Sequence, residues 1–188
     1  DGLKIQKTKS SKEVHSRSIT LSLNPNLEKP ESYKLHITKN GIWVVASEPK
    51  GWFYALQTLT QLVELNDLYR EKNLLPYCLI EDEPRFAYRG LHLDVSRHFF
   101  PTSFIKRYID LMARFKYNFF HWHLTDDQGW RIEIKKFPKL TETGAFRDAT
   151  LKGHAGDFPP RYDSMRYGGY YTQDEIKDII SYAASRYI

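Results

Sequence analysis

The densest group of chemically capable side chains in this 188-residue chain lies between Asn118 and Arg131. Its fourteen positions hold two histidines, two aspartates, two tryptophans and an arginine. The first half alternates and is rich in aromatic residues, as a buried strand is, and Gly129 lets the polar second half turn. Many α/β enzymes form the wall of an active site where a strand delivers polar groups into a loop, so the segment predicts a functional site.

A second polar run, Arg89-Gly-Leu-His-Leu-Asp-Val-Ser-Arg-His98, has the same design. Within each expected strand the polar side chains share one face: His92 and Asp94 in the first, His121 and His123 in the second. Arg97 and Asp126 follow just after the two strands. Because functional groups gather at the carboxyl ends of parallel strands, we expect Arg97 and Asp126 to converge although they are 29 positions apart.

These polar residues call for different interpretations. We interpret His92, Asp94, His121 and His123 as structural groups that hydrogen-bond to one another. The Arg97 guanidinium is a planar fork of donors, suited to vicinal hydroxyls or a carboxylate, so Arg97 and Asp126 are the functional candidates. Trp130 and Arg131 stay open between structural and functional roles.

A metal site is the alternative for the two neighbouring histidines, since residues at i and i+2 on a strand share a face. Two aspartates follow His121 and His123 closely. Further ligands would have to come from later strands, and none is identified in the sequence. We therefore predict no metal.

Residues 1–82 predict a small α+β domain. Strands are expected at residues 19–23, 33–38, 42–46 and 74–80, the second and third joined as a hairpin by Asn40-Gly41. Pro49-Lys-Gly51 opens a helix with a helically spaced apolar face, formed by Phe53, Leu56, Leu59 (or Thr60) and Val63. The charged, proline-stopped run Glu81-Asp-Glu-Pro84 predicts the domain boundary.

Residues 85–188 predict alternating strands and helices, which is typical of a parallel α/β fold. The expected order is a strand at 88–95, a helix from Pro101-Thr102, a strand at 118–124, a long loop at 135–171 and a helix capped by Thr172-Gln-Asp-Glu175. The inward faces of the two helices are expected to be Phe104, Ile105, Tyr108, Ile109, Met112 and Phe115, and Ile176, Ile179, Ile180, Ala183 and Tyr187. Only 104 residues follow Pro84, whereas a closed (β/α)₈ barrel needs roughly 250.

Composition and charge bear on whether the protein binds nucleic acid, spans a membrane or is secreted. The formal charge of +5 comes from basic residues scattered among acids, and the densest run, from Lys4 to Arg17, lies near a terminus, so we predict no nucleic-acid partner. Cys78 is the single cysteine and is interpreted as a small buried apolar residue. Neither a membrane span nor a signal peptide is evident, and the aromatic content of 15% fits sugar stacking or core filling equally.

Several long motifs in the same order resemble glycoside hydrolase family 20, the exo-β-N-acetylhexosaminidases. They are the run from Arg89 to Pro101, the run from Lys116 to Arg131, Gly144-Ala-Phe-Arg147, Tyr167-Gly-Gly-Tyr-Tyr-Thr-Gln-Asp-Glu-Ile176, and Gly51-Trp-Phe-Tyr-Ala-Leu-Gln-Thr-Leu59. The resemblance implies an α/β fold in which residues 1–82 form the family's small accessory domain. Residues 85–188 would then be the first βα units of an incomplete (β/α)₈ TIM barrel.

The resemblance also implies a mechanism, in which the substrate's 2-acetamido oxygen attacks the anomeric carbon without metal or organic cofactor. By motif match, Arg97 would hold the C3 and C4 hydroxyls of the terminal sugar. Asp126 would support a histidine that positions the acid and that is absent from this chain. A glycan with a terminal N-acetylhexosamine is the implied partner, in a periplasmic, secreted or lysosome-like compartment.

The departures from the family pattern are equally informative. The family's catalytic Asp-Glu pair follows a later barrel strand, and Asp174-Glu175 stands instead in a helix cap. We therefore expect a fragment that is inactive alone and that self-associates through apolar surfaces left uncovered. The alternatives are a stand-alone carbohydrate-binding or interaction module and a metal-dependent hydrolase.

Overall fold

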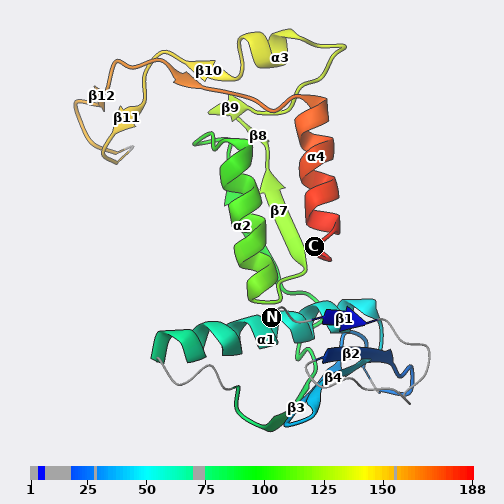
Figure 1. Ribbon diagram of the computed structural model, residues 1–188. Coiled ribbons are helices and arrows are strands. Elements are labelled where there is room, and N and C mark those ends of the chain that lie inside the picture. The colour runs from blue at the N-terminus through cyan, green and yellow to red at the C-terminus, as the bar shows by residue number, and fades with distance from the viewer. Residues whose placement is uncertain (1–3, 7–17, 28, 70–74, 155) are drawn as a thin grey trace. The chain divides into compact units, whose positions relative to one another are not determined.

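The computed structural model of the protein describes residues 4–6, 18–27, 29–69, 75–154 and 156–188 (Figure 1). The chain forms two compact units. The first comprises Asp1–Arg89 with Arg114–Lys116, and the second comprises Gly90–Ala113 with Tyr117–Ile188. In the described part of the chain, no helix has the length and apolar character that crossing a membrane requires.

The first unit is a five-stranded sheet with the order β1-β2-β4-β3-β5. Its strands are β1 (Lys4–Gln6), β2 (Ser18–Leu23), β3 (Tyr33–Thr38), β4 (Gly41–Ala46) and β5 (Cys78–Asp82). β2 runs parallel to β1 and β4, whereas β3 is antiparallel to β4 and β5. The predicted hairpin is therefore confirmed, and Gly41 at its turn has a φ of 146°, which an L side chain rarely adopts.

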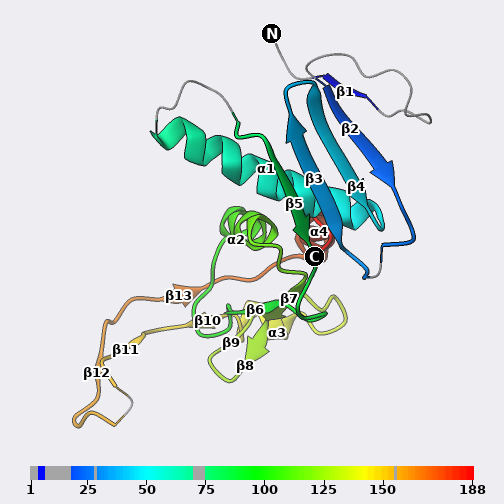
Figure 2. The same cartoon turned by 90° about the horizontal axis from the view of Figure 1, so that it is seen from below.

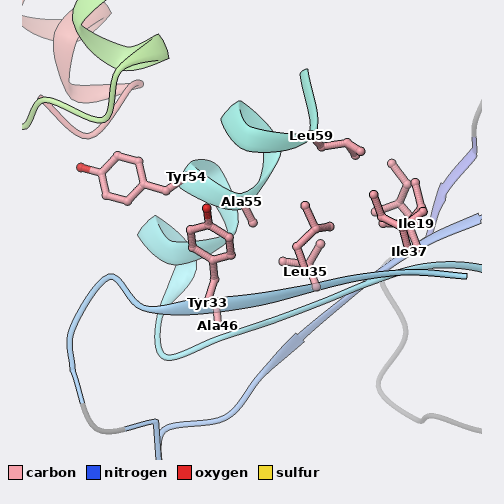
Figure 3. Packing of buried hydrophobic residues seen from close by; sticks show 10 residues of the cluster. Ile19, Tyr33, Leu35, Ile37, Ala46, Tyr54, Ala55 and Leu59 are labelled. Carbon is pink, nitrogen blue, oxygen red and sulfur yellow. The ribbon is translucent and has the colours of Figure 1, made fainter. Parts of the chain in front are cut away.

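Helix α1 (Pro49–Tyr69) packs across one face of this sheet (Figure 2). Strict alternation in β3 and β4 sends every second side chain toward the helix, and Tyr33, Leu35 and Ile37 are buried from β3. Figure 3 shows these three side chains on the side of the sheet that α1 covers, and they share one core with Tyr54, Ala55 and Leu59 of the helix. The periodicity of the two elements thus creates a single core between the helix and the sheet.

Two expectations for this unit are wrong in detail. The centre of the buried face of α1 lies at Tyr54, Ala55 and Leu59, while Phe53 and Leu56 are partly buried and Val63 is exposed. The later turns of this 21-residue helix extend past the core, and Leu65 and Leu68 there are exposed. β5 begins at Cys78, not before Pro76, because proline has no amide hydrogen for the ladder. Cys78 itself is partly buried.

The second unit is organised around β6 (Gly90–Asp94) and β7 (Phe119–His123), which pair in parallel as expected. They are connected through α2 (Thr102–Arg114), and α2, β7 and α4 (Gln173–Ala184) run side by side in Figure 1. Their shared core contains the buried residues Val95, Ile105, Ile109, Tyr171, Ile179 and Ala183. The predicted capping box is confirmed: the Thr172 hydroxyl accepts from the Glu175 amide, and the Glu175 carboxylate accepts from the Thr172 amide.

The buried faces of α2 and α4 contain fewer residues than we expected from the sequence. Phe115 and Tyr187 lie beyond the ends of their helices, and both are exposed, as are Phe104 and Ile180. The expected long loop instead contains the short helix α3 (Lys139–Glu142) and two two-residue ladders. The first ladder pairs β10 (Phe146–Arg147) with β13 (Tyr167–Gly168), and the second pairs β11 (Leu151–Lys152) with β12 (Arg161–Tyr162). A third pairs β8 (Thr125–Asp126) with β9 (Gly129–Trp130).

Replacing Leu35 by alanine should destabilise the first unit by about 2–5 kcal/mol, because Leu35 is fully buried between β3 and α1. Amide hydrogen exchange of β3 and β4 gives the free energy of opening for this unit alone. Leu79→Ala is the matched control, since Leu79 lies in the neighbouring strand β5 with an exposed side chain and should change stability by less than about 0.5 kcal/mol. Equal effects of the two substitutions would contradict this core.

Candidate functional site

Arg97 and Asp126 meet beyond the carboxyl ends of β6 and β7. The parallel register sets Asp94 opposite His123, so the segments that follow both strands leave the sheet at the same edge. Nη1 of Arg97 donates to Oδ2 of Asp126 and also lies 3.3 Å from Oδ2 of Asp94. The convergence of Arg97 and Asp126 predicted from the sequence is confirmed.

The Asp94 carboxylate also shapes the turn that carries Arg97. Its Oδ1 accepts hydrogen bonds from the amides of Ser96 at 2.9 Å and Arg97 at 3.1 Å, an Asx turn that fixes the backbone as it leaves β6. The Arg97 side chain is 43% exposed, and its Nη2 lies 3.9 Å from Oδ1 of the exposed Asp127. One edge of the guanidinium is therefore fixed by carboxylates while the side chain as a whole keeps an accessible surface.

The surroundings of Asp94 and Asp126 favour the ionised form of both carboxyl groups. Partial burial acts to raise the pKa of Asp94, but the Arg97 amide, the Arg97 charge and the Ser96 amide outweigh it and hold this pKa below its ordinary value. Hydrogen bonding from Asp127, chiefly from its backbone amide, lowers the pKa of Asp126 to about 2, with Arg97 contributing through a hydrogen bond and its charge. The site therefore presents a fixed ion-pair network at neutral pH.

Three histidines form a group on β6 and β7, next to this network. His92 lies beside His121 across the ladder, with ring centroids 4.6 Å apart, and His123 completes the group. One nitrogen from each ring lies within 4.8 Å of the other two. The sequence reasoning had looked for further metal ligands only in later strands and did not join His92 to the pair at His121 and His123. Nε2 of His123 lies 3.0 Å from Oδ2 of Asp126 and 3.5 Å from Nη1 of Arg97, so this atom already belongs to the ion-pair network.

Two other arginines hold the backbone around Arg97, and the sequence reasoning missed both roles. Arg131, which it left undecided, is fully buried and donates to the carbonyls of Val95 and Ser96. Nη1 of Arg147 donates to the Arg97 carbonyl at 2.8 Å. The one available signal was that Arg131 and Arg147 both occur within the family-like motifs.

The comparisons with known protein families account for nearly the whole chain. The model of the glycosyl hydrolase family 20 catalytic domain matches residues 86–188, and the model of glycosyl hydrolase family 20, domain 2, matches residues 1–83. This chain belongs to glycosyl hydrolase family 20. The resemblance read from the motifs is thereby confirmed, as is the broad α/β fold class.

Individual relatives carry concordant names. A beta-hexosaminidase of Porphyromonas gingivalis is 45% identical over 164 residues, which are 85% of this chain and 20% of that protein. An N,N'-diacetylchitobiase of Vibrio harveyi is 37% identical over 167 residues, which are 86% of this chain and 18% of that protein. The crystal structure of a family 20 exo-β-N-acetylglucosaminidase from Vibrio harveyi in complex with N-acetylglucosamine superposes with a TM-score of 0.76 at 43% identity, covering 90% of this chain and 26% of that one. The chain thus spans about a fifth to a quarter of the length of these relatives.

The low pKa of Asp126 predicts a specific pH dependence of stability. A carboxyl whose folded-state pKa lies near 2, below its ordinary value of about 3.9, stabilises the fold above pH 4, and that contribution disappears as the pH falls toward 2. Asp126→Asn should therefore lower the stability of the second unit at pH 7, and its difference from wild type should shrink between pH 4 and pH 2. Hydrogen exchange of α2 and β7 across this range measures it.

The exposed Asp148, replaced by asparagine, is the control for the loss of one surface carboxylate. Asp148→Asn should change the stability of the second unit by less than about 0.5 kcal/mol at pH 7. A difference for Asp126→Asn that stays constant down to pH 2 would contradict the low pKa.

Proposed function

We propose that this chain is the N-terminal part of an exo-β-N-acetylhexosaminidase, which releases terminal N-acetylglucosamine or N-acetylgalactosamine from β-linked glycans. Residues 1–82 serve as the accessory domain, and residues 85–188 supply the first βα units of a (β/α)₈ catalytic barrel. Membership of family 20 and the names of the relatives support this function. The observation that carries it is the contact of Arg97 with Asp126 at the carboxyl ends of two adjacent parallel strands.

Arg97 is the substrate-binding residue in this proposal. A guanidinium has five N–H donors, and two carboxylates engage Nη1, which leaves donors for the vicinal C3 and C4 hydroxyls of a terminal sugar. Because Asp94 and Asp126 fix the fork before substrate arrives, little side-chain entropy is lost when the sugar binds. This preorganisation suits recognition of one sugar ring in one orientation.

Asp126 has a supporting role that it exerts through another residue. Its carboxylate orients a histidine outside this chain, and that histidine positions the general acid. The substrate's own acetamido oxygen is the nucleophile, so the enzyme needs a carboxylate to orient the acetamido group and an acid to protonate the leaving oxygen. Both groups belong to later barrel strands, so we expect the 188-residue chain not to hydrolyse substrate by itself.

The test compares Arg97 variants in the protein extended through the later barrel strands that the relatives contain. Arg97→Ala should reduce kcat/KM for a chromogenic β-N-acetylglucosaminide by about 10- to 150-fold, the equivalent of losing one charged hydrogen bond worth about 1.5–3 kcal/mol. Arg186→Ala, which removes an arginine paired with Asp110, is the control and should leave kcat/KM unchanged. Hydrolysis by the isolated chain, abolished by Arg97→Ala, would refute its inactivity.

A stand-alone binding module is the first rival function. Its specific support is the set of exposed large apolar side chains on the second unit, among them Leu111, Phe119 and Ile180, which we also expect to promote self-association of the isolated chain. Calorimetric titration of the isolated chain with N-acetylglucosamine separates the two proposals. Saturable micromolar binding would favour the module, whereas the hexosaminidase proposal expects at most millimolar binding, because one arginine is a small part of a sugar site.

A metal-dependent hydrolase is the second rival, favoured by the group His92, His121 and His123. Nε2 of His123 already lies 3.0 Å from Oδ2 of Asp126 and 3.5 Å from Nη1 of Arg97, so zinc would have to displace these contacts before this nitrogen could bind it. We predict that elemental analysis after dialysis against zinc finds less than about 0.1 equivalent, with no loss on His121→Ala. Stoichiometric zinc that His121→Ala removes would support the rival.

A further inference from the structure

Arg131 is a buried arginine with an unusual set of partners. Its side chain is 1% exposed, and within the described residues no aspartate or glutamate pairs with it. The guanidinium donates instead to four backbone carbonyls: Nε to Val95 at 3.0 Å, Nη2 to Ser96 at 2.8 Å, and Nη1 to Gly169 at 3.1 Å and to Ala145. Every nitrogen of the fork is therefore used to hold main chain.

This arrangement carries an electrostatic cost that ordinary packing would not require. Burial lowers the pKa of the Arg131 guanidinium from its ordinary value, and the nearby Arg147 charge adds to that effect. A buried charge without a counterion is tolerated only where hydrogen bonds satisfy it well, and an apolar side chain of similar size would avoid the cost. What the guanidinium provides, and an apolar residue of similar size would not, is four directed hydrogen bonds to the backbone.

The neighbouring sequence makes room for this side chain. A Cβ at Gly129 would stand 2.4 Å from Cζ of Arg131 and 2.8 Å from its Nε, so a larger residue there would displace the guanidinium. The Arg131 main chain is fixed as well, because its amide donates to the Leu124 carbonyl at 2.9 Å and its carbonyl accepts from the Tyr171 amide at 2.8 Å. Gly129 and Arg131 thus act as one unit in which the glycine provides the space for the fork.

Two of the four carbonyls that Arg131 holds belong to the residues immediately before Arg97. Val95 and Ser96 form the first two residues after β6, and the Ser96 hydroxyl donates to the Gly129 carbonyl at 2.7 Å. The same fork fixes Ala145 and Gly169, which belong to the segments leading into β10 and out of β13. One guanidinium therefore locks the turn that carries Arg97 to two segments that lie far from it in sequence.

We propose that Arg131 is a positioning residue that directs the Arg97 side chain toward Asp126 and thereby presets the sugar-binding fork. The sugar-binding part of this statement rests on the proposed function, whereas the effect of Arg131 on the pairing of Arg97 with Asp126 does not. Arg131 does not touch substrate. It acts through the backbone of Val95 and Ser96.

The first experiment reads the Arg97–Asp126 pair directly in the isolated chain. The variant Arg131→Lys keeps the charge but replaces the planar fork by a compact ammonium, and Gly129→Ala keeps Arg131 but fills the space of its guanidinium. The ionisation of Asp126, whose pKa is about 2 in the unaltered chain, is followed by the ¹³C shift of its carboxyl from about pH 1 to pH 5. Arg97→Met sets the upper limit of the shift, and Arg186→Lys and Gly156→Ala are the matched controls in the same unit.

Both variants at the Arg131 site should raise the pKa of Asp126 by at least half of the rise produced by Arg97→Met. The two controls should leave it unchanged. A general loss of stability does not produce this pattern, because the shift is read from the folded population. An Asp126 pKa that is unchanged in folded Arg131→Lys and Gly129→Ala would overturn the proposal.

A measurement on the unaltered chain covers the case in which neither variant folds. The Nε proton of Arg131 should exchange with solvent at least about 100-fold more slowly than that of Arg97, since the guanidinium is buried and bonded to carbonyls. Equal exchange rates for the two arginines would show that the fork does not hold the turn and would overturn the proposal.

A second experiment uses the protein extended through the later barrel strands. It distinguishes the effect of Arg131 on Arg97 from the role of Arg97 in binding the sugar. Arg131→Lys should lower kcat/KM in the wild-type background but produce no further loss in an Arg97→Ala background, because it acts through Arg97. An undiminished loss in that background would contradict the proposed route. A raised Asp126 pKa without any effect on kcat/KM would leave the positioning intact and refute the sugar-binding role of Arg97 instead.

Discussion

The parallel register of β6 with β7 is the constraint on which the rest of the site depends. It sets His92 opposite His121 and Asp94 opposite His123, and the Val95 amide extends the ladder by donating to the His123 carbonyl at 3.1 Å. A slip of one residue would turn the polar face of either strand into the apolar core between α2 and α4, so the register is strongly specified. With it fixed, the segments after both strands must leave at the same edge.

Two different kinds of interaction then hold Arg97 in the position that the register gives it. Carboxylates grip the Arg97 side chain, while arginines grip its backbone through the carbonyls of residues 95 to 97. The two sets are complementary. The carboxylates accept hydrogen bonds from the Arg97 side chain and fix its direction, and the two arginines donate to the carbonyls of residues 95 to 97 and fix the backbone from which the side chain extends. In the proposed role of Arg97, a side chain held at both ends would lose little conformational freedom when a sugar binds.

The sequence foretold the part of this site that depends on periodicity. Period-two alternation identifies the polar faces of β6 and β7, and strand ends are where polar groups converge, so Arg97 with Asp126 follows from pattern alone. The role of Arg131 does not follow, because its partners are backbone carbonyls up to 38 positions away and carry no side-chain signature. The faces of α1 and α4 were misjudged at Val63, Ile180 and Tyr187 because helical spacing identifies an apolar stripe but not where the packed neighbour ends.

The charge balance of the site narrows the chemistry that it can recognise. The carboxylates of Asp94, Asp126 and Asp127 lie around the Arg97 guanidinium, whereas Arg131 and Arg147 donate to the backbone of residues 95 to 97. The end of the Arg97 side chain therefore has three anionic neighbours. A phosphate, a sulfate or a carboxylated sugar would gain one cationic partner and face three anionic ones, and such like-charge contacts cost more than the pairing returns. Neutral hydroxyls meet no such penalty, since they donate to carboxylates as readily as they accept from a guanidinium. In the proposed sugar-binding role of Arg97, the acidic surroundings that fix its side chain therefore favour an uncharged polyol over an anion as the ligand of its remaining donors.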